Sequence, residues 1–140
     1  MRILSIDFGE KKIGLAISDP LGITAQGLET LRGKKKDEVP EALLKLCQEY
    51  GVEEVVIGLP INMNGSLGPK AKEVLAFVPE LEKTLKLPVK TWDERLTSLE
   101  AGRLMIAEGL SRKKQKEKSD RLAAMLILQS YLAAKKGAKP

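Results

Sequence analysis

The two strand-like segments at the start of the chain are separated by only four residues, and this spacing restricts the fold more than any other feature. Residues 2–8 and residues 13–18 both alternate between apolar and small or polar side chains, which is the two-residue period of a β-strand. A connection as short as residues 9–12 joins antiparallel neighbours, so the pattern predicts a hairpin. The first of these strands contains an acid, Asp7, in otherwise apolar surroundings.

Strand and helix patterns alternate through the rest of the chain. The expected elements up to residue 93 are a third strand around 24–31, a helix from an Asp37 cap to Tyr50, a buried strand at 54–58, a helix from Pro69 that Pro79 kinks or splits before Leu87, and a strand at 89–93. The expected later elements are a helix from the capping box Thr97–Glu100 to about Gly109, a basic mobile loop at 111–118, and a buried last helix from a Ser119 cap to about Lys135. This order predicts an α/β fold with a mixed sheet, in which three antiparallel strands precede parallel βα units and helices cover both faces. A ribonuclease H-like fold has the same order.

The length of 140 residues suits a single domain, which we place at residues 1–136, with a frayed tail at 137–140. The first residues lack the apolar run of a signal peptide, and no window approaches the length of a membrane span, so we expect a cytoplasmic protein with no membrane partner. Cys47, the one cysteine, lies among leucines and is interpreted as a core residue of a helix.

The residue types present limit the kinds of catalytic site that the protein can form. The sequence contains no histidine, which excludes histidine-based triads and histidine-ligated zinc sites. Carboxylates, lysines, hydroxyls and a metal remain as the agents of any reaction. The net charge of +5 favours an anionic partner such as nucleic acid.

Several acids are predicted to meet at one edge of the sheet. Asp7 lies in a strand that this topology makes central, Asp93 and Glu94 end the last strand, and Asp120 opens the final helix. Each has a structural alternative, because Asp7 could cap a turn, Glu94 could pair with Arg95, and Asp120 could stabilise a helix N-terminus. For Asp93 the capping of the next turn is the preferred interpretation.

Metal binding would explain a carboxylate in an apolar strand. The hairpin places Gly14 and Ala16 opposite Asp7, and these small residues leave room for ions and a phosphate backbone. Clustered acids repel one another unless cations neutralise them, and oxygen ligands alone favour Mg²⁺ or Mn²⁺. Two such ions can activate water and stabilise the leaving oxygen in phosphodiester cleavage.

The chain also resembles a known family, the YqgF/RuvX family, which has a ribonuclease H-like fold related to that of Holliday junction resolvases. The matching segments, in chain order, are Asp7–Ala16, Gly58–Pro60 with Asn62 and Gly65-Ser66, Asp93–Thr97, and Asp120–Ala124. One departure is Lys12, which stands where arginine is common in the family, and lysine lacks the planar fork that grips phosphate.

The resemblance implies a metal-dependent nuclease that acts in 5′-end processing of pre-16S ribosomal RNA or on branched DNA such as Holliday junctions. It makes Asp7, Glu94 and Asp120 the catalytic and metal-binding acids, with Mg²⁺ or Mn²⁺ as cofactor. The expected substrate-binding residues are Lys12, Asn62, Arg95, Thr97, Lys113, Lys114 and Lys116. A junction resolvase would work as a homodimer, whereas an enzyme that trims RNA could work as a monomer.

Two other functions compete with this one. A non-catalytic nucleic-acid-binding module in ribosome maturation or transcription would keep the fold and the basic surface without cleavage. An ATP-binding lobe of the actin and sugar-kinase type shares an Asp-x-Gly hairpin such as the one at Asp7, but those proteins clasp the nucleotide between two lobes.

Overall fold

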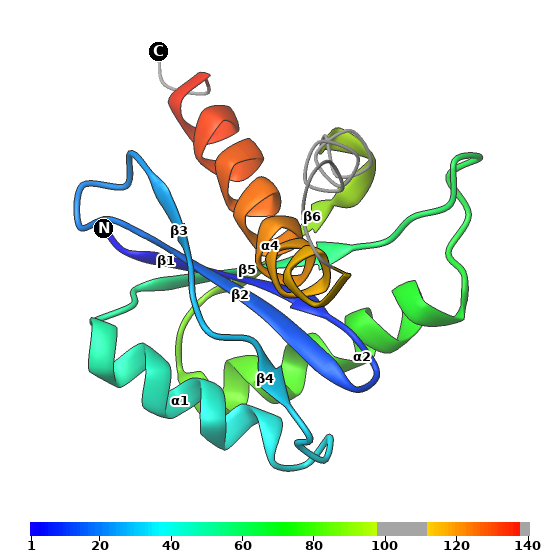
Figure 1. Ribbon diagram of the computed structural model, residues 1–140, viewed down its shortest axis with the longest axis horizontal. Helices are drawn as coiled ribbons and strands as arrows, with labels where there is room; N and C mark the ends of the chain where they lie inside the picture. The colour runs from blue at the N-terminus through cyan, green and yellow to red at the C-terminus, as the bar shows by residue number, and fades with distance from the viewer. Residues whose placement is uncertain (98–111, 138–140) are drawn as a thin grey trace.

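A computed structural model describes the backbone of residues 1–97 and 112–137, and the side chains of residues 1–97 and 121–136 (Figure 1). The elements follow one another as β1 (Ile3–Phe8), β2 (Lys12–Ser18), β3 (Ala25–Gly27), β4 (Leu31–Arg32), α1 (Val39–Tyr50), β5 (Glu54–Leu59), α2 (Pro69–Leu85), β6 (Val89–Asp93), the short 3₁₀ helix η1 (Glu94–Leu96) and α4 (Arg112–Gly137). The helix predicted from the capping box to Gly109 lies outside the described residues. None of the helices within the described part combines the length and the apolar character that crossing a lipid bilayer requires.

The strands form one mixed sheet in the order β3-β2-β1-β5-β6, with β4 also paired to β2. β1 and β2 are antiparallel, as the short connection predicted, whereas β5 pairs in parallel with β1 on its other side and β6 pairs in parallel with β5. The predicted mixed α/β architecture is therefore confirmed. Because β1 lies in the middle of the sheet, Asp7 is carried to the centre of the edge where the parallel strands end.

Helices cover both faces of the sheet (Figure 1). α1 and α2 pack on one face in a core that includes Ile6, Leu15 and Phe77, while α4 packs on the other face, where its Ile127 joins Val56 of the sheet in a second core. Alternation along each strand divides the side chains between these two layers. Cys47 belongs to the α1 core and is buried, as predicted, and its burial raises the pKa of the thiol to about 11.

The predicted third strand is two short strands, and both pair with β2. β3 lies beside Ala16–Ser18, and β4 lies beside Lys12 and Ile13. Between them a single bond from the backbone N–H of Leu28 to the carbonyl of Leu15, 2.9 Å long, continues the contact. The regular strand pairing with β2 is interrupted there, so the segment predicted as one strand forms two strands, β3 and β4.

The predicted Asp37 cap of α1 is wrong. The N-cap position is Glu38, which makes no side-chain capping bond. Instead, its Oε1 accepts a hydrogen bond of 3.0 Å from the backbone N–H of Lys35. Pro40 in the first turn lacks an N–H group, which removes one of the donors that a capping oxygen could bind. The predicted end of the helix at Gly51 is confirmed, and this residue is left-handed with φ 67°.

Helix α2 continues through Pro79, so the predicted split does not occur. Pro79 has no backbone N–H group, so the helical hydrogen bond to the carbonyl of Leu75, four residues earlier, is missing. Leu75 and Pro79 are both exposed, so water can satisfy that carbonyl. The buried face of the helix, which includes Phe77 and Leu81, remains continuous and holds the helix on the sheet.

The predicted basic loop at 111–118 is also wrong within the described residues, because α4 begins at Arg112. The segment from Arg112 to Lys118 contains only Arg, Lys, Gln and Glu, which all have high helix propensity, and no glycine or proline interrupts it. Ser119 therefore lies inside the helix and does not cap it. The basic character of the segment directed the interpretation towards a loop, whereas its propensity favoured a helix.

Candidate active site

Asp7 lies near the carboxyl end of the central strand, on the face of the sheet that α4 covers. Directly opposite it on β2 is Gly14, and the next pair on the same face of the sheet is Ser5 with Ala16. Asp7 is half-buried, whereas its neighbour Phe8 points into the α1/α2 core. The small residues expected opposite the acid are therefore in place, and the carboxylate lies beside a surface with little side-chain bulk.

Glu94 comes to the same region from the end of β6. It is the first residue of η1, and its Cγ and Cδ lie 3.2 Å from the position that a Cβ on Gly58 would occupy. Ser5 pairs with Val56, so Gly58 stands two residues beyond Val56 just as Asp7 stands two residues beyond Ser5. The side chain of Glu94 therefore lies over the strand adjacent to Asp7, at the same level of the sheet.

Helix α4 runs antiparallel to β5, because Tyr131 bonds to Glu54 at the start of that strand while Ile127 lies over Gly58 further along it. The hydroxyl of Ser5 donates a hydrogen bond of 2.7 Å to the carbonyl of Ala124 and so fixes the helix against β1. Asp120 precedes Ala124 by about one helical turn, in the direction of Asp7. Asp120 lies within α4 and does not open it, which corrects the sequence interpretation, and its side chain is outside the described set.

A second network couples α4 to the segment that carries Glu94. The indole Nε1–H of Trp92 donates to Ser130 Oγ at 3.0 Å, and the Ser130 hydroxyl donates to the carbonyl of Leu96 at 3.1 Å. The rings of Trp92 and Tyr131 meet edge to face, with their centroids 5.5 Å apart. These contacts make the position of η1 dependent on the position of the helix.

Asp93 has the capping role that the sequence favoured. Its carboxylate accepts the backbone N–H of Arg95 at 2.9 Å and pairs with the guanidinium at 2.7 Å. The hydrogen bond from the Arg95 side chain is the main reason that the pKa of Asp93 is lowered. Asp93 is thus committed to Arg95, which leaves Glu94 as the acid of this pair that lies over Gly58.

The predicted substrate-binding residues lie in three places. Arg95 reaches the carbonyl of Asn62 at 3.4 Å, and Thr97 Oγ1 donates to the carbonyl of Glu94 at 2.7 Å, so these three residues lie together beyond β5 and β6. Lys12 opens β2 opposite Arg32 of β4. Lys113, Lys114 and Lys116 lie in the first turns of α4, and their side chains are outside the described residues.

The loop that carries Asn62 is shaped by its own polar groups. Asn62 Nδ2 donates to Ser66 Oγ at 3.0 Å, and the Ser66 hydroxyl donates to Asn64 Oδ1 at 2.6 Å. In Figure 1 the connection between β5 and α2 extends away from the body of the molecule. It presents exposed polar groups beyond the strand ends.

The donor chemistry suits a hard divalent cation, because Asp7 and Glu94 supply carboxylate oxygens only. Among the described side chains no group of three or more acids, cysteines and histidines could hold a metal ion. The carboxylate of Asp120 is not among these described side chains. The meeting of all three acids therefore stays a prediction, whereas the approach of Glu94 to the level of Asp7 is a feature of the structure.

Sequence reasoning missed two residues that position the site. Gly58 lets the Glu94 side chain and Ile127 approach the sheet, and a glycine inside an apolar strand is a recognised sign of such an approach. Ser5 is fully buried and holds α4 through its hydroxyl. Its signal was a second polar residue on the Asp7 face of an apolar strand.

Comparisons with known proteins support one family. A family model described as "RuvX: Holliday junction resolvase" matches residues 1–134. A protein of Clostridium kluyveri named "Putative pre-16S rRNA nuclease" is 52% identical over 132 residues, which cover 94% of this chain and 96% of that protein. A protein of Syntrophomonas wolfei with the same name is also 52% identical and is covered to 94%.

Solved structures share the fold at low identity. RuvC of T. thermophilus in complex with Holliday junction substrate has a TM-score of 0.60 and 18% identity, with 98% of this chain and 96% of that chain covered. The fowlpox virus Holliday junction resolvase has a TM-score of 0.54 and 16% identity, with 96% and 99% covered. The predicted ribonuclease H-like arrangement is thereby confirmed as the fold of the chain.

Proposed function

The chain belongs to the RuvX family, and from this premise we propose that it is a divalent-metal-dependent nuclease that hydrolyses phosphodiester bonds in pre-16S ribosomal RNA. The observation that carries the proposal is the position of Glu94 over Gly58, at the level of Asp7 and beneath the helix that bears Asp120. The relatives that are about half identical over nearly the whole chain support the substrate by their names. Such a substrate places the protein in the cytoplasm.

In this proposal Asp7, Glu94 and Asp120 hold Mg²⁺ or Mn²⁺. The bound ions would supply the positive charge that activates a water molecule and offsets the charge of the leaving oxygen. Asp7 would contribute its ligand from the central strand of the sheet. Gly14, directly opposite Asp7, adds no side chain at the place proposed for the phosphate that is attacked.

The surrounding residues orient the substrate. Arg95 is held by Asp93 and touches the Asn62 loop, so it fixes that loop beside the strand ends and adds positive charge there. Thr97 follows η1, and its hydroxyl donates a hydrogen bond to the carbonyl of Glu94, which restricts the movement of this acid. Lys12, Lys113, Lys114 and Lys116 contribute charge towards the phosphate backbone in a sequence-independent manner.

Substitution of the acids tests the assignment. Asp7→Asn, Glu94→Gln and Asp120→Asn are each expected to abolish Mg²⁺-dependent cleavage while leaving nucleic-acid binding largely intact. Glu53→Gln is the matched control, because it makes the same change of charge at an exposed residue. Glu53 lies just before β5, at the end of that strand that is far from Gly58 and the candidate site. If the three variants cleaved at the rate of the wild type, the assignment would be wrong.

A second candidate substrate is branched DNA, which the description of the matching family model favours. A side-by-side assay on a four-way DNA junction and a ribosomal precursor fragment, with Mg²⁺ and with chelator, separates the two. Preference for the junction, together with a dimer in sedimentation, would indicate a resolvase. Binding of either substrate without cleavage would indicate a non-catalytic module.

A further inference from the structure

A hollow of about 370 Å³ lies where the segment of β3 and β4 meets helix α4. Its lining consists of Glu29, Thr30, Arg32 and Arg121. The volume is at the lower end of the roughly 300–1,000 Å³ that ligand sites occupy. Because the two guanidinium groups outnumber the one carboxylate, the hollow suits an anion.

Arg32 lies on the same face of the sheet as Asp7. Its neighbour Leu31 pairs with Ile13 of β2, and both of these residues belong to the α1/α2 core. Successive side chains of a strand point to opposite faces, so Arg32 is directed to the face that α4 covers. The hollow therefore lies on the same side of the sheet as the candidate active site.

Arg121 reaches the hollow from α4, across Gly27 of β3. Its Cβ and Cδ lie 3.1 Å and 3.4 Å from the position that a Cβ on Gly27 would occupy. The aliphatic part of Arg121 therefore rests on the strand, where a larger residue would displace it, and the side chain continues into the lining of the hollow. Gly27 admits Arg121 over the sheet in the same way that Gly58 admits Glu94.

The strand register gives the separation between the hollow and Asp7. The backbone contact that extends β3 ends at Leu15 and the pairing of β4 begins at Ile13, so residues 29 and 30 lie opposite Gly14. Gly14 in turn lies opposite Asp7. Neighbouring strands are about 4.8 Å apart, which places the backbone of residues 29 and 30 roughly 10 Å from that of Asp7.

From this arrangement we infer that the hollow is a phosphate subsite, which holds a phosphate of the cut strand near the bond that the acids attack. This inference rests on the proposed function for the position of that bond. The strand crosses β2 at Gly14, which has no side chain to block its path. The planar fork of an arginine binds two phosphate oxygens at once, so Arg32 and Arg121 orient the strand as well as attract it.

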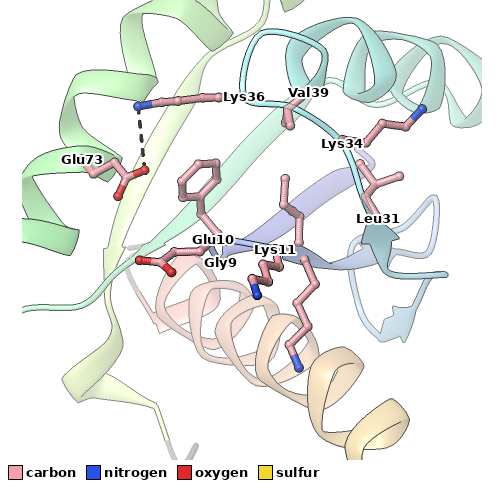
Figure 2. Close-up of a pocket in the computed structure, with 11 residues that line it drawn as sticks. Gly9, Glu10, Lys11, Leu31, Lys34, Lys36, Val39 and Glu73 are labelled. Atoms are coloured by element: carbon pink, nitrogen blue, oxygen red, sulfur yellow. Dashed lines mark ion pairs between the residues drawn. The ribbon is translucent and has the colours of Figure 1, made fainter.

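A smaller hollow of about 60 Å³, at the turn between β1 and β2, lacks this arrangement (Figure 2). Lys34 and Lys36 both contribute to its lining, but Figure 2 shows their ammonium groups directed away from one another. Lys36 points to Glu73, and its Nζ lies 3.8 Å from the carboxylate. Because these two charges do not meet on one anion, this pair of lysines supplies a control with the same change of charge.

Equilibrium binding in chelator tests the subsite without cleavage. The probe is a single-stranded RNA oligonucleotide, and fluorescence anisotropy gives its affinity over a series of salt concentrations. Arg32→Ala with Arg121→Ala should weaken binding by roughly 3- to 10-fold. The slope of log affinity against log salt should fall by about 0.7, the contribution of one phosphate of a single strand. Lys34→Ala with Lys36→Ala should leave the slope unchanged.

The double variant Arg32→Lys with Arg121→Lys separates an oriented phosphate contact from general positive charge. It keeps both charges and most of each aliphatic chain, so the salt slope and the thermal midpoint should stay at the values of the wild type. The affinity should still fall, by roughly 2- to 5-fold, because lysine lacks the fork. Wild-type affinity in this variant would overturn the inference, as would an equal loss of slope in the arginine-to-alanine pair and the lysine control pair.

Glu29→Gln supplies a test in the opposite direction. It removes the one negative charge of the lining, so the variant should bind the oligonucleotide more tightly than the wild type. Unchanged affinity in Glu29→Gln would show that no phosphate enters the hollow.

Cleavage then locates the phosphate along the strand. Oligonucleotides in which one phosphate at a time is an uncharged methylphosphonate are cut with Mg²⁺, and the cut bond defines the register. In the wild type, replacement at one position near that bond should slow cleavage. The same replacement should have no further effect in the variant that lacks Arg32 and Arg121. Additive effects of the two changes at every position would contradict the subsite.

The two readouts separate this inference from the nuclease proposal. The expected affinities and slopes in chelator, without cleavage by the wild type in Mg²⁺, would refute the nuclease activity alone. Cleavage by the wild type, with the same affinity and slope in the arginine-to-alanine pair as in the wild type, would refute the subsite alone.

Discussion

Gly58→Ala is a perturbation that moves Glu94 without altering any acid. A Cβ at this position would lie 2.6 Å from Ile127 Cδ1 and 3.2 Å from the Cγ and Cδ of Glu94. Carbon atoms in contact prefer roughly 3.5–4.0 Å, so the Ile127 methyl must move by about 1 Å and the Glu94 side chain by a few tenths of an ångström. The new methyl group thus acts on the core and on the candidate site together.

The two effects have different sizes. Ile127 is fully buried, and an extra methyl group in a packed core costs about 1–3 kcal/mol of unfolding free energy. The thermal midpoint should therefore fall by several degrees, at about 2–8 °C per kcal/mol. Misplacement of a catalytic group by 1 Å can cost about 10²-fold in rate, so for a shift of Glu94 by a few tenths of an ångström we expect cleavage to slow by roughly 3- to 10-fold.

The matched control is the double variant Gly58→Ala with Ile127→Val, because valine lacks the Cδ1 atom that approaches most closely. Ile127→Val alone should cost about 0.5–1.5 kcal/mol. The double variant should recover part of the stability that the single Gly58 substitution loses, while its cleavage stays slow because the contact with Glu94 remains. A Gly58→Ala variant with the stability and the cleavage rate of the wild type would refute the reasoning.

Three further predictions concern contacts of residues other than Asp7, Glu94 and Asp120. Tyr131→Phe removes the donor to the buried Glu54, 3.0 Å away, so the unfolding free energy from denaturant titration should fall by ~1–3 kcal/mol, and an unchanged value would mean that the bond is not needed. Backbone N–H groups, chiefly that of Thr24, donate hydrogen bonds to Asp19 and lower the pKa of its carboxyl to about 2. The stability that these bonds provide is complete above pH 3.8 and is lost as the pH falls through about 2. The thermal midpoint of Asp19→Asn should therefore change less between pH 3.8 and 2 than the thermal midpoint of the wild type. Arg95→Ala frees the 60–68 loop from the end of β6, and its amide hydrogen exchange should accelerate by up to about fivefold, the equivalent of an exposed contact worth 0–1 kcal/mol; equal exchange would show that the loop holds itself.

Much of the fold could be predicted because it depends on local pattern. Alternation in residues 2–8 and 13–18 placed Asp7 and Phe8 on opposite faces, and the short turn fixed their strands as an antiparallel pair. The apolar run at 54–58 indicated a buried parallel strand, which β5 is. In each case the information lies within a few neighbouring residues, and backbone geometry converts it directly into structure.

The errors occurred where two local rules conflicted. At 111–118 charge suggested a loop and propensity suggested a helix, and the structure follows propensity from Arg112 onwards. At α1 a good capping residue, Asp37, stood before a proline that removes a capping donor. Pro79 should have interrupted α2, but the buried side of that helix outweighs one lost hydrogen bond on its exposed side.

The sequence by itself determined the order of the elements, the central place of the strand that bears Asp7 and the division of side chains between two layers, since periodicity and turn length act over short distances. Only the tertiary structure decided that the Glu94 side chain packs over Gly58 at the level of Asp7, and that α4 is held to β1 by a bond between Ser5 and Ala124, residues 119 positions apart. Packing between distant segments selects such contacts through shape and buried hydrogen bonds, and no local pattern records which distant residue will satisfy a given group.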